Sequence, residues 1–138
     1  AAHHIVVQSM LGEDTTHRFD SRMAIFESFR ELHPVLKDKY YLNPKDEEDD
    51  PYESSRMDAL MINPHGVFGI YALREVFEYT RFWAIGSGAE FALGAMYAVY
   101  EQHDDAETIA RIGVEAGAEF NNATALPMTS YSVALKSA

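Results

Sequence analysis

The sequence is organised around residues 82–98, which read FWAIGSGAEFALGAMYA. The run 82–85 is short, apolar and rich in aromatic and β-branched residues, which predicts a buried strand. Gly86-Ser87-Gly88 follows, and glycine tolerates the positive φ that a tight turn needs. From Ala89 the pattern becomes helical, with small or flexible residues on one face: Ala92, Ala95, Met96 and Val99. We therefore predict a strand, a tight turn and a helix that packs closely on a sheet.

Two further amphipathic helices flank this segment. The first is predicted over residues 20–36, with Asp20 or Ser21 as its cap and Pro34 expected to kink or restart it. Its apolar stripe consists of Ile25, Phe29, Leu32 and Leu36. The second begins at Asp104-Asp105 and is ended by Asn121-Asn122 and Pro127. Its stripe consists of Ile109, Ile112, Ala116 and Phe120.

The remaining apolar runs predict strands. Residues 57–62 and 67–72 are separated by Asn63-Pro64-His65-Gly66, whose proline and glycine suit a hairpin turn. Residues 76–79 are expected to pair with 82–85, and Tyr131–Leu135 forms a last strand. Residues 1–11 fit either a short helix or a strand. The order of elements predicts an α+β fold rather than strict alternation of strands and helices.

Composition narrows the class of protein. The 138 residues suffice for one domain, and 47% of them are hydrophobic, which is too many for a disordered chain. A formal net charge of −11 argues against a general nucleic-acid binder, so Tyr71, Phe77, Phe82 and Trp83 are expected in the core of the sheet rather than in a base-stacking platform. There is no cysteine, no membrane-length apolar run and no signal peptide, which makes the cytoplasm the default location.

No metal or other cofactor is predicted. Five consecutive acids, residues 46–50, lie in a predicted loop at 43–55, where a hard cation is one interpretation. The run lacks the spacing and the glycine of a calcium loop, so a solvated acidic loop is favoured. The six histidines show no helical metal-ligand spacing and are expected at the surface.

The Gly-Ser-Gly turn permits several functions. It precedes a helix N-terminus, where free N–H groups favour phosphate, with Gly86 and Gly88 as the substrate-binding residues. A dinucleotide site would need a returning parallel strand, which the sequence does not supply. Ser87 as a nucleophile would need a base, and Ala84 stands where a nucleophile elbow has its first glycine. A purely structural turn with Ser87 as the N-cap is also open.

Residues 83–95, WAIGSGAEFALGA, resemble the proteasome β-subunit superfamily, especially its HslV-type branch. In that family a strand ending Ile-Gly-Ser-Gly leads into an alanine-rich helix, a second helix and further strands. The resemblance implies a four-layer αββα sandwich and a hydrolase whose N-terminal threonine attacks an amide, with its own amino group as base. It also implies that Ser87 supports that amino terminus and that Glu119 stands near the family's acidic residue at the end of the second helix.

The chain departs from the family at its beginning. Ala1 has no hydroxyl, and nothing before residue 20 supplies the family's opening strands or its lysine. We therefore expect a single proteasome-like domain over residues 1–138, truncated at its N-terminus and inactive alone. Exposed sheet edges predict self-association, and the family implies a homo-oligomeric ring that acts on peptides. Two alternatives stay open: a non-catalytic proteasome-like scaffold, and an unrelated α+β anion-binding module.

Overall fold

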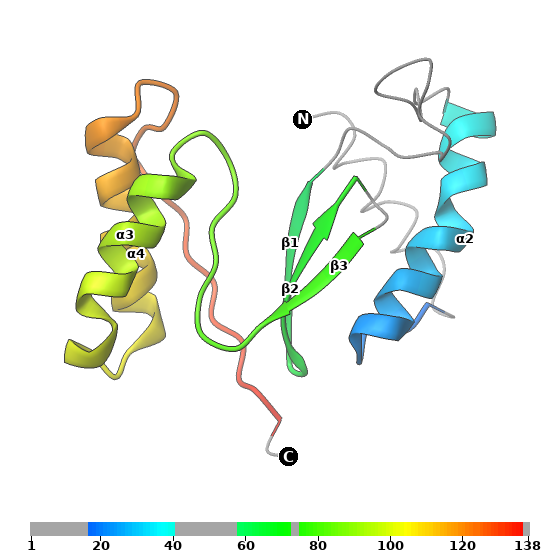
Figure 1. The fold of residues 1–138 in the computed structure, drawn as a ribbon, viewed down its shortest axis with the longest axis horizontal. Coiled ribbons are helices and arrows are strands. Elements are labelled where there is room, and N and C mark those ends of the chain that lie inside the picture. The colour runs from blue at the N-terminus through cyan, green and yellow to red at the C-terminus, as the bar shows by residue number, and fades with distance from the viewer. Residues whose placement is uncertain (1–16, 41–57, 73–74, 137–138) are drawn as a thin grey trace. The chain divides into compact units, whose positions relative to one another are not determined.

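The computed structural model describes residues 17–40, 58–72 and 75–136. Along these residues the elements are α2 (Arg22–Tyr40), β1 (Ala59–Asn63), β2 (Gly66–Tyr71), β3 (Glu75–Tyr79), α3 (Ala89–Val99), the 3₁₀ helix η1 (Tyr100–Gln102) and α4 (Ala106–Phe120) (Figure 1). The chain divides into two compact units, Ala1–Glu78 and Tyr79–Ala138, which we describe one at a time. The predictions for residues 1–11 and for the acidic loop at 43–55 lie outside the described residues.

The α+β class is confirmed. The strands form one three-stranded antiparallel sheet in the order β1-β2-β3, and the helices are separate from it in sequence. Among the described residues, no helix combines the length and the apolar character that crossing a bilayer requires.

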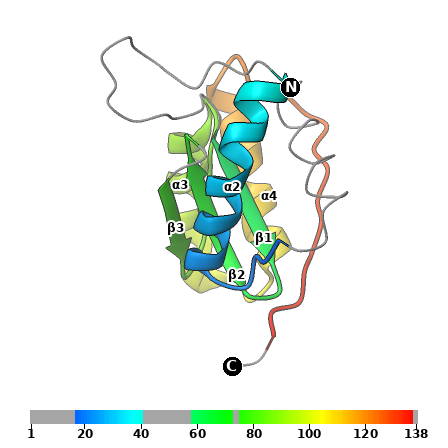
Figure 2. The same ribbon diagram turned by 90° about the vertical axis from the view of Figure 1, so that its right-hand side faces the viewer.

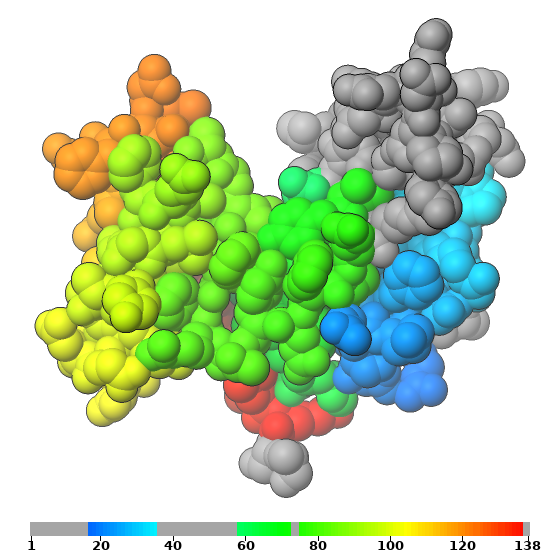
Figure 3. All heavy atoms as spheres, in the orientation of Figure 1, coloured from blue at the N-terminus to red at the C-terminus, as the bar shows by residue number. Residues whose placement is uncertain are grey.

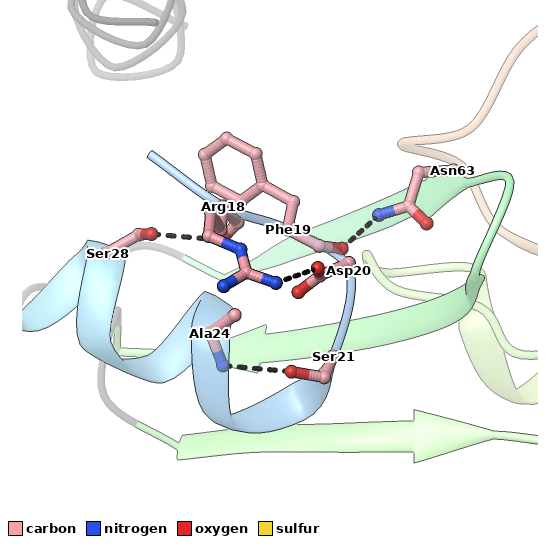
Figure 4. Close-up of polar contacts among 7 residues, drawn as sticks. All are labelled: Arg18, Phe19, Asp20, Ser21, Ala24, Ser28 and Asn63. Atoms are coloured by element: carbon pink, nitrogen blue, oxygen red, sulfur yellow. Dashed lines mark hydrogen bonds and ion pairs between the residues drawn. The ribbon is translucent and has the colours of Figure 1, made fainter. Parts of the chain in front are cut away.

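Helix α2 begins at the predicted cap. The backbone N–H of Ala24 donates to Ser21 Oγ at 3.2 Å, so Ser21 satisfies one of the free donors of the first turn (Figure 4). Asp20 instead pairs with Arg18, whose guanidinium holds the pKa of the Asp20 carboxyl below its usual value. Pro34 lies inside the helix, which runs on to Tyr40, so the predicted restart does not occur.

The predicted hairpin is confirmed. β1 and β2 are antiparallel, with Asn63 paired to Gly66 and only two residues in the turn between them. Asn63 stabilises the turn through both polar atoms of its side chain. Its Oδ1 accepts from the backbone N–H of His65 at 2.8 Å, and its Nδ2 donates to the carbonyl of Phe19 at 2.8 Å (Figure 4). The turn is thereby tied to the segment that leads into α2.

The core of the first unit lies between α2 and one face of the sheet. Helix α2 crosses that face in Figure 2, and its side chains pack against those of the strands in the space-filling view of Figure 3. The buried side chains come from α2 and β2: Ile25, Phe29, Leu32, Phe68 and Ile70. The stripe predicted for α2 is therefore its core face, as far as Leu32.

The other face of this sheet carries apolar side chains that are partly exposed. Ile62 is 55% exposed and Phe77 is 48% exposed, although both lie in strands. Phe77 contacts Tyr71 edge to face, with ring centroids 5.7 Å apart. The prediction that Phe77 belongs to the core was wrong, because successive strand residues point to opposite faces and α2 covers the face of Val76.

Residues 82–85 do not form the predicted strand. They have no regular secondary structure, and β3 pairs with β2 rather than with them. The alternation of the sequence is nevertheless present, since Phe82 and Ala84 pack on the second core while Trp83 and Ile85 are exposed. A strand requires a hydrogen-bonded neighbour, and the described residues provide none here.

In the second unit, α3 packs against α4. The sequence predicted a sheet under the small face of α3, but this unit covers that face with a helix. Ala92 and Met96 meet α4 at Gly113, where an added Cβ would lie 2.7 Å from Met96 Cγ and 3.3 Å from the Ala92 carbonyl. Glycine thus allows a close helix contact, since an added side chain would require Met96 to move.

The buried face of α4 is rotated from the predicted stripe. Ile109, Gly113 and Gly117 are buried, whereas Phe120 is 68% exposed. The close contact uses glycines next to Ile109, which leaves Phe120 of the predicted stripe on the flank of the helix pair. There Phe120 meets Phe91 of α3, with ring centroids 5.7 Å apart.

Tyr131–Leu135 is not a strand either. From Asn121 to Lys136 no regular secondary structure follows α4, and Tyr131 is 91% exposed. Ser130 Oγ donates to Glu107 Oε1 at 2.8 Å, which ties this segment to the start of α4. Within the described part of the chain, no strand lies beside it to complete the predicted pairing.

The cap of α4 gives a pH-dependent prediction. Asp105 Oδ2 accepts from the Thr108 side chain at 2.6 Å and from its N–H at 2.8 Å; these bonds hold the pKa of Asp105 below its usual value. A lowered pKa contributes stability that is present above the unfolded pKa and lost as pH falls through the folded one. Asp105→Ala should therefore lower the Tm near neutral pH, with a smaller difference in acid. Asp104→Ala removes the same charge without a cap bond and is the control; equal effects of the two would refute this role.

Candidate functional site

Ser87 lies in the turn that leads into α3. Gly86 has φ = +101°, and its carbonyl accepts from the N–H of Ala89 at 3.1 Å, so the predicted tight turn is confirmed. The N-cap position is occupied by Gly88, with no side-chain cap bond. The interpretation of Ser87 as the N-cap was therefore wrong, and its exposed side chain is used elsewhere.

The Ser87 hydroxyl belongs to a network centred on Asn121. Ser87 Oγ donates to Asn121 Oδ1 at 3.0 Å, and Asn121 Nδ2 donates back to the Ser87 carbonyl at 3.0 Å. Asn121 Oδ1 also accepts from the N–H of Ala123 at 3.0 Å and from Thr124 Oγ1 at 3.2 Å. One amide side chain thus holds the turn before α3 and the turn after α4 together.

Two glycines allow this meeting. A Cβ on Gly88 would lie 2.8 Å from Thr124 Oγ1 and 3.3 Å from Gly117 Cα, and a Cβ on Gly117 would lie 3.5 Å from the Gly88 carbonyl. The N–H of Asn121 donates to the Gly117 carbonyl at 3.0 Å, which sets the amide at the end of α4. Gly88 is therefore needed for space, since its φ is −90° and any residue could adopt it.

The other predicted site residues lie around this network. Gly86 is exposed with open space around it, while Gly88 is buried against α4. Glu119 is exposed in the last turn of α4, and no hydrogen bond or ion pair joins it to Ser87 within the described ranges. The structure brings together Ser87 and Asn121 rather than Ser87 and Glu119.

Sequence reasoning missed Asn121 and Thr124 as site residues. The sequence predicts Asn121 only as a helix stop, and it does follow the last residue of α4. The sequence does contain a pattern that predicts their turn. Asn121 followed three residues later by Thr124 is typical of a turn in which side chains bond to the nearby backbone. The sequence does not show that they lie near Ser87, because Asn121 is 34 residues away and reaches Ser87 only through the packing of α3 against α4.

The network defines what Ser87 can do chemically. Its only hydroxyl proton is directed at Asn121, so its oxygen lone pairs remain available to accept from an N–H donor. No histidine or carboxylate bonds to Ser87 in the described part of the chain, so a base that would activate it as a nucleophile is lacking there. The same residues contain no group of three or more metal-ligating side chains.

Comparison with known proteins identifies relatives by structure. No protein-family model matches the chain, and no curated protein matches it. The structure of Thiobacillus denitrificans BPH matches with a TM-score of 0.81 and 43% sequence identity, covering 92% of this chain and 67% of that one. Thiobacillus denitrificans BPH in complex with epoxomicin matches with a TM-score of 0.81 and 42% identity over the same shares of each chain. The chain belongs to the same protein family as Thiobacillus denitrificans BPH.

Proposed function

We propose that this chain is the C-terminal portion of a proteasome-like, HslV-type threonine amidohydrolase or peptidase subunit. The nucleophilic N-terminal threonine then lies outside the printed residues, and this part supplies the group that supports it. The observation that carries the proposal is the Ser87 hydroxyl, which is exposed in the turn before α3 and oriented by Asn121.

Ser87 is suited to hold an amino group. With its proton donated to Asn121 at 3.0 Å, the Ser87 oxygen offers lone pairs to an incoming N–H. An α-amino group has an ordinary pKa of about 8, so near neutral pH it exchanges readily between ammonium and the free base that accepts the nucleophile's proton. Ser87 thus positions the base without taking part in bond cleavage.

The complex formed by the relative supports the proposal that this protein binds a ligand of the same kind. BPH from Thiobacillus denitrificans forms a complex with epoxomicin, and this chain aligns with 67% of that protein. We propose that the full-length protein likewise binds epoxomicin and that residues corresponding to the remaining third contribute the nucleophile. The substrate class is peptide amides.

The fold we propose for the whole protein is the four-layer αββα sandwich. Its first support is the open sheet face that carries Ile62 and Phe77. An exposed apolar face of a sheet gains stability when another layer covers it, and α2 packs on the opposite face. A second sheet packed on this face would bury both side chains.

The second support comes from the regions that failed to form strands. Residues 82–85 and 131–135 have the alternation of strands but no hydrogen-bonded neighbour in the described ranges. The flank of the helix pair likewise leaves Phe91 and Phe120 exposed. Strands supplied by the rest of the protein would pair with these segments and give that flank a sheet to cover.

Open edges and apolar faces also favour association with copies of the same chain. We propose a homo-oligomer, built as a ring in the cytoplasm. Sedimentation of the 138-residue chain should show a self-associated species. A single monomeric boundary at all concentrations would contradict this part of the proposal.

The main test compares the full-length protein with the 138-residue chain described here. The full-length protein is expected to bind epoxomicin and to hydrolyse peptide amides, and the 138 residues alone should do neither. In the full-length protein, Ser87→Ala should lower kcat/KM by about 10- to 100-fold, since one hydrogen bond to a charged amine is lost. Peptide hydrolysis at a range of substrate concentrations measures this.

Ser132→Ala is the matched control, because Ser132 is exposed and makes no hydrogen bond in the described structure. It should leave turnover unchanged. Equal activity of the two variants would show that Ser87 does not contribute to the active site. Peptide hydrolysis by the 138-residue chain alone would show that the nucleophile does not lie outside it. A full-length protein that binds no epoxomicin and hydrolyses no peptide would favour the scaffold alternative.

A further inference from the structure

Residues 82–85 run beside α3 although no strand pairs with them in the described ranges (Figure 1). Phe82 packs on Tyr100 at the end of the helix, with ring centroids 5.3 Å apart, and the Gly86 turn leads into its beginning. The chain from Phe82 to Ser87 spans about 16 Å when extended, and the helical turns from Ala89 to Tyr100 rise by about the same length. The segment is therefore nearly fully extended, and contacts at its two ends decide its position.

Arg81 joins the start of this segment to the end of α3. Its guanidinium carbon lies 4.1 Å from the centroid of the Tyr100 ring and 6.0 Å from that of the Phe82 ring. Its Nη2 also pairs with Glu101 Oε1 at 2.5 Å. A guanidinium within about 6 Å of an aromatic face is attracted by the negative charge of that face. The side chain of Arg81 thus ties the segment before the glycine turn to the residues that follow α3.

Tyr100 and Glu101 belong to η1, the 3₁₀ turn that directly follows α3. Gln102 Nε2 donates to the Ala98 carbonyl at 2.8 Å, and the last carbonyls of a helix have no partner within it. Tyr100 also packs on the second core beside Phe82. The ring that receives Arg81 is therefore held in place by a hydrogen bond of its own turn and by the core.

The ring contributes more to this contact than the carboxylate does. The side chain of Glu101 is 83% exposed and that of Arg81 is 45% exposed, and solvent screens an ion pair at such a position. Tyr100 is only partly exposed, so its face is fixed where the guanidinium lies. We therefore expect removal of the ring to weaken the hold on Arg81 more than removal of the carboxylate charge.

We propose that Arg81 and Tyr100 form an aromatic anchor, which holds residues 82–85 along α3 before any strand pairs with them. The hydrogen bonds between Ser87 and Asn121 hold the other end of the segment. The anchor thereby preforms the approach to the glycine turn and keeps Trp83 on the exposed side of the segment. All of these contacts lie within the second unit, so the anchor is tested separately from the proposed function.

The first experiment is a double-mutant cycle on the 138-residue chain, with thermal unfolding followed by the fluorescence of Trp83, the only tryptophan. Arg81→Ala should lower the Tm of the second unit by about 4–8 °C, the shift for loss of one such contact in a domain of this size. In a Tyr100→Leu background the same substitution should lower the Tm by less than about half as much, because the ring is gone. Glu101→Gln alone should also lower the Tm by less than about half as much as Arg81→Ala. Equal effects of Arg81→Ala in both backgrounds, or equal effects of Glu101→Gln and Arg81→Ala, would overturn the aromatic anchor.

The second experiment separates a hold on the segment from general stabilisation of the unit. Trp83 lies within the segment and stacks on Tyr79, with ring centroids 4.3 Å apart. Below the unfolding transition, acrylamide should quench Trp83 more strongly in Arg81→Ala than in the unsubstituted chain, because a released segment exposes the indole.

Arg111→Ala is the matched control for the quenching experiment. Arg111 is also half-exposed and pairs with Glu107 at 3.9 Å, but it stacks on no ring within the described residues. Its substitution should leave the quenching of Trp83 unchanged. Equal quenching of Arg81→Ala, Arg111→Ala and the unsubstituted chain would show that the segment keeps its position without Arg81, and would overturn the proposal.

Discussion

Phe68→Ala is expected to lower the free energy of unfolding of the first unit by about 3–5 kcal/mol. Phe68 is 1% exposed and is among the largest fully buried side chains of the described structure. It lies in β2 and packs with Ile25 and Phe29 of α2, so its removal leaves a cavity between helix and sheet. The expected loss is a large fraction of the free energy of unfolding of a small domain, which is about 5–15 kcal/mol.

Urea unfolding followed by far-UV circular dichroism would measure this change. Phe77→Ala is the matched control, since it removes the same side chain from the neighbouring strand, where 48% of it is exposed. In the 138-residue chain the control substitution should lower the free energy of unfolding by about 1 kcal/mol or less. Similar losses for the two variants would contradict the assignment of the core to one face. In the full-length protein, a larger loss for Phe77→Ala would support the second sheet.

Gly88→Val is expected to destabilise the helix pair by about 3 kcal/mol. Its Cβ would lie 2.8 Å from Thr124 Oγ1 and 3.3 Å from Gly117 Cα, and the second of these is backbone that cannot turn away. Relief of the clash would separate α3 from α4 and move Thr124 away from Asn121. The variant should therefore lose both stability and the Ser87 network.

Gly94→Ala is the control for Gly88→Val. Gly94 lies within α3 and has nothing within 4 Å of an added Cβ, so alanine should stabilise the helix by about 0.5–1 kcal/mol. Trp83 fluorescence during urea unfolding reports on this unit. A loss of stability in Gly88→Val and a gain in Gly94→Ala would show that Gly88 is required because the space beside it is filled. A neutral Gly88→Val would refute the close approach of the helices.

The local features of the fold were predicted well, because each depends on residues close in sequence. Ser21 and Asp105 cap α2 and α4, and the hairpin turns at Pro64 and His65. The positive φ of Gly86 also follows from its turn. In each case a short-range hydrogen bond or a dihedral preference decides the structure without help from the rest of the chain.

The wrong predictions share a different cause. Residues 82–85 and 131–135 carry the alternation of strands, but a strand also requires a neighbour with free backbone groups, and alternation does not supply one. The stripe predicted for α4 follows the spacing of its apolar residues; Ile109 is buried as predicted, but the close contact with α3 buries Gly113 and Gly117 and leaves Phe120 exposed. Packing distance between helices is set by both partners, so one helix read alone cannot reveal it.

The sequence by itself determined where Ser87 stands: on a glycine turn at the start of a helix, with its backbone shaped by Gly86. Only the tertiary structure decided what the hydroxyl bonds to, because Asn121 lies 34 residues away and reaches it through the contact of Gly88 with Gly117. Turn geometry depends on dihedral preferences of adjacent residues, whereas the direction of a side-chain hydrogen bond depends on what packing brings within about 3 Å.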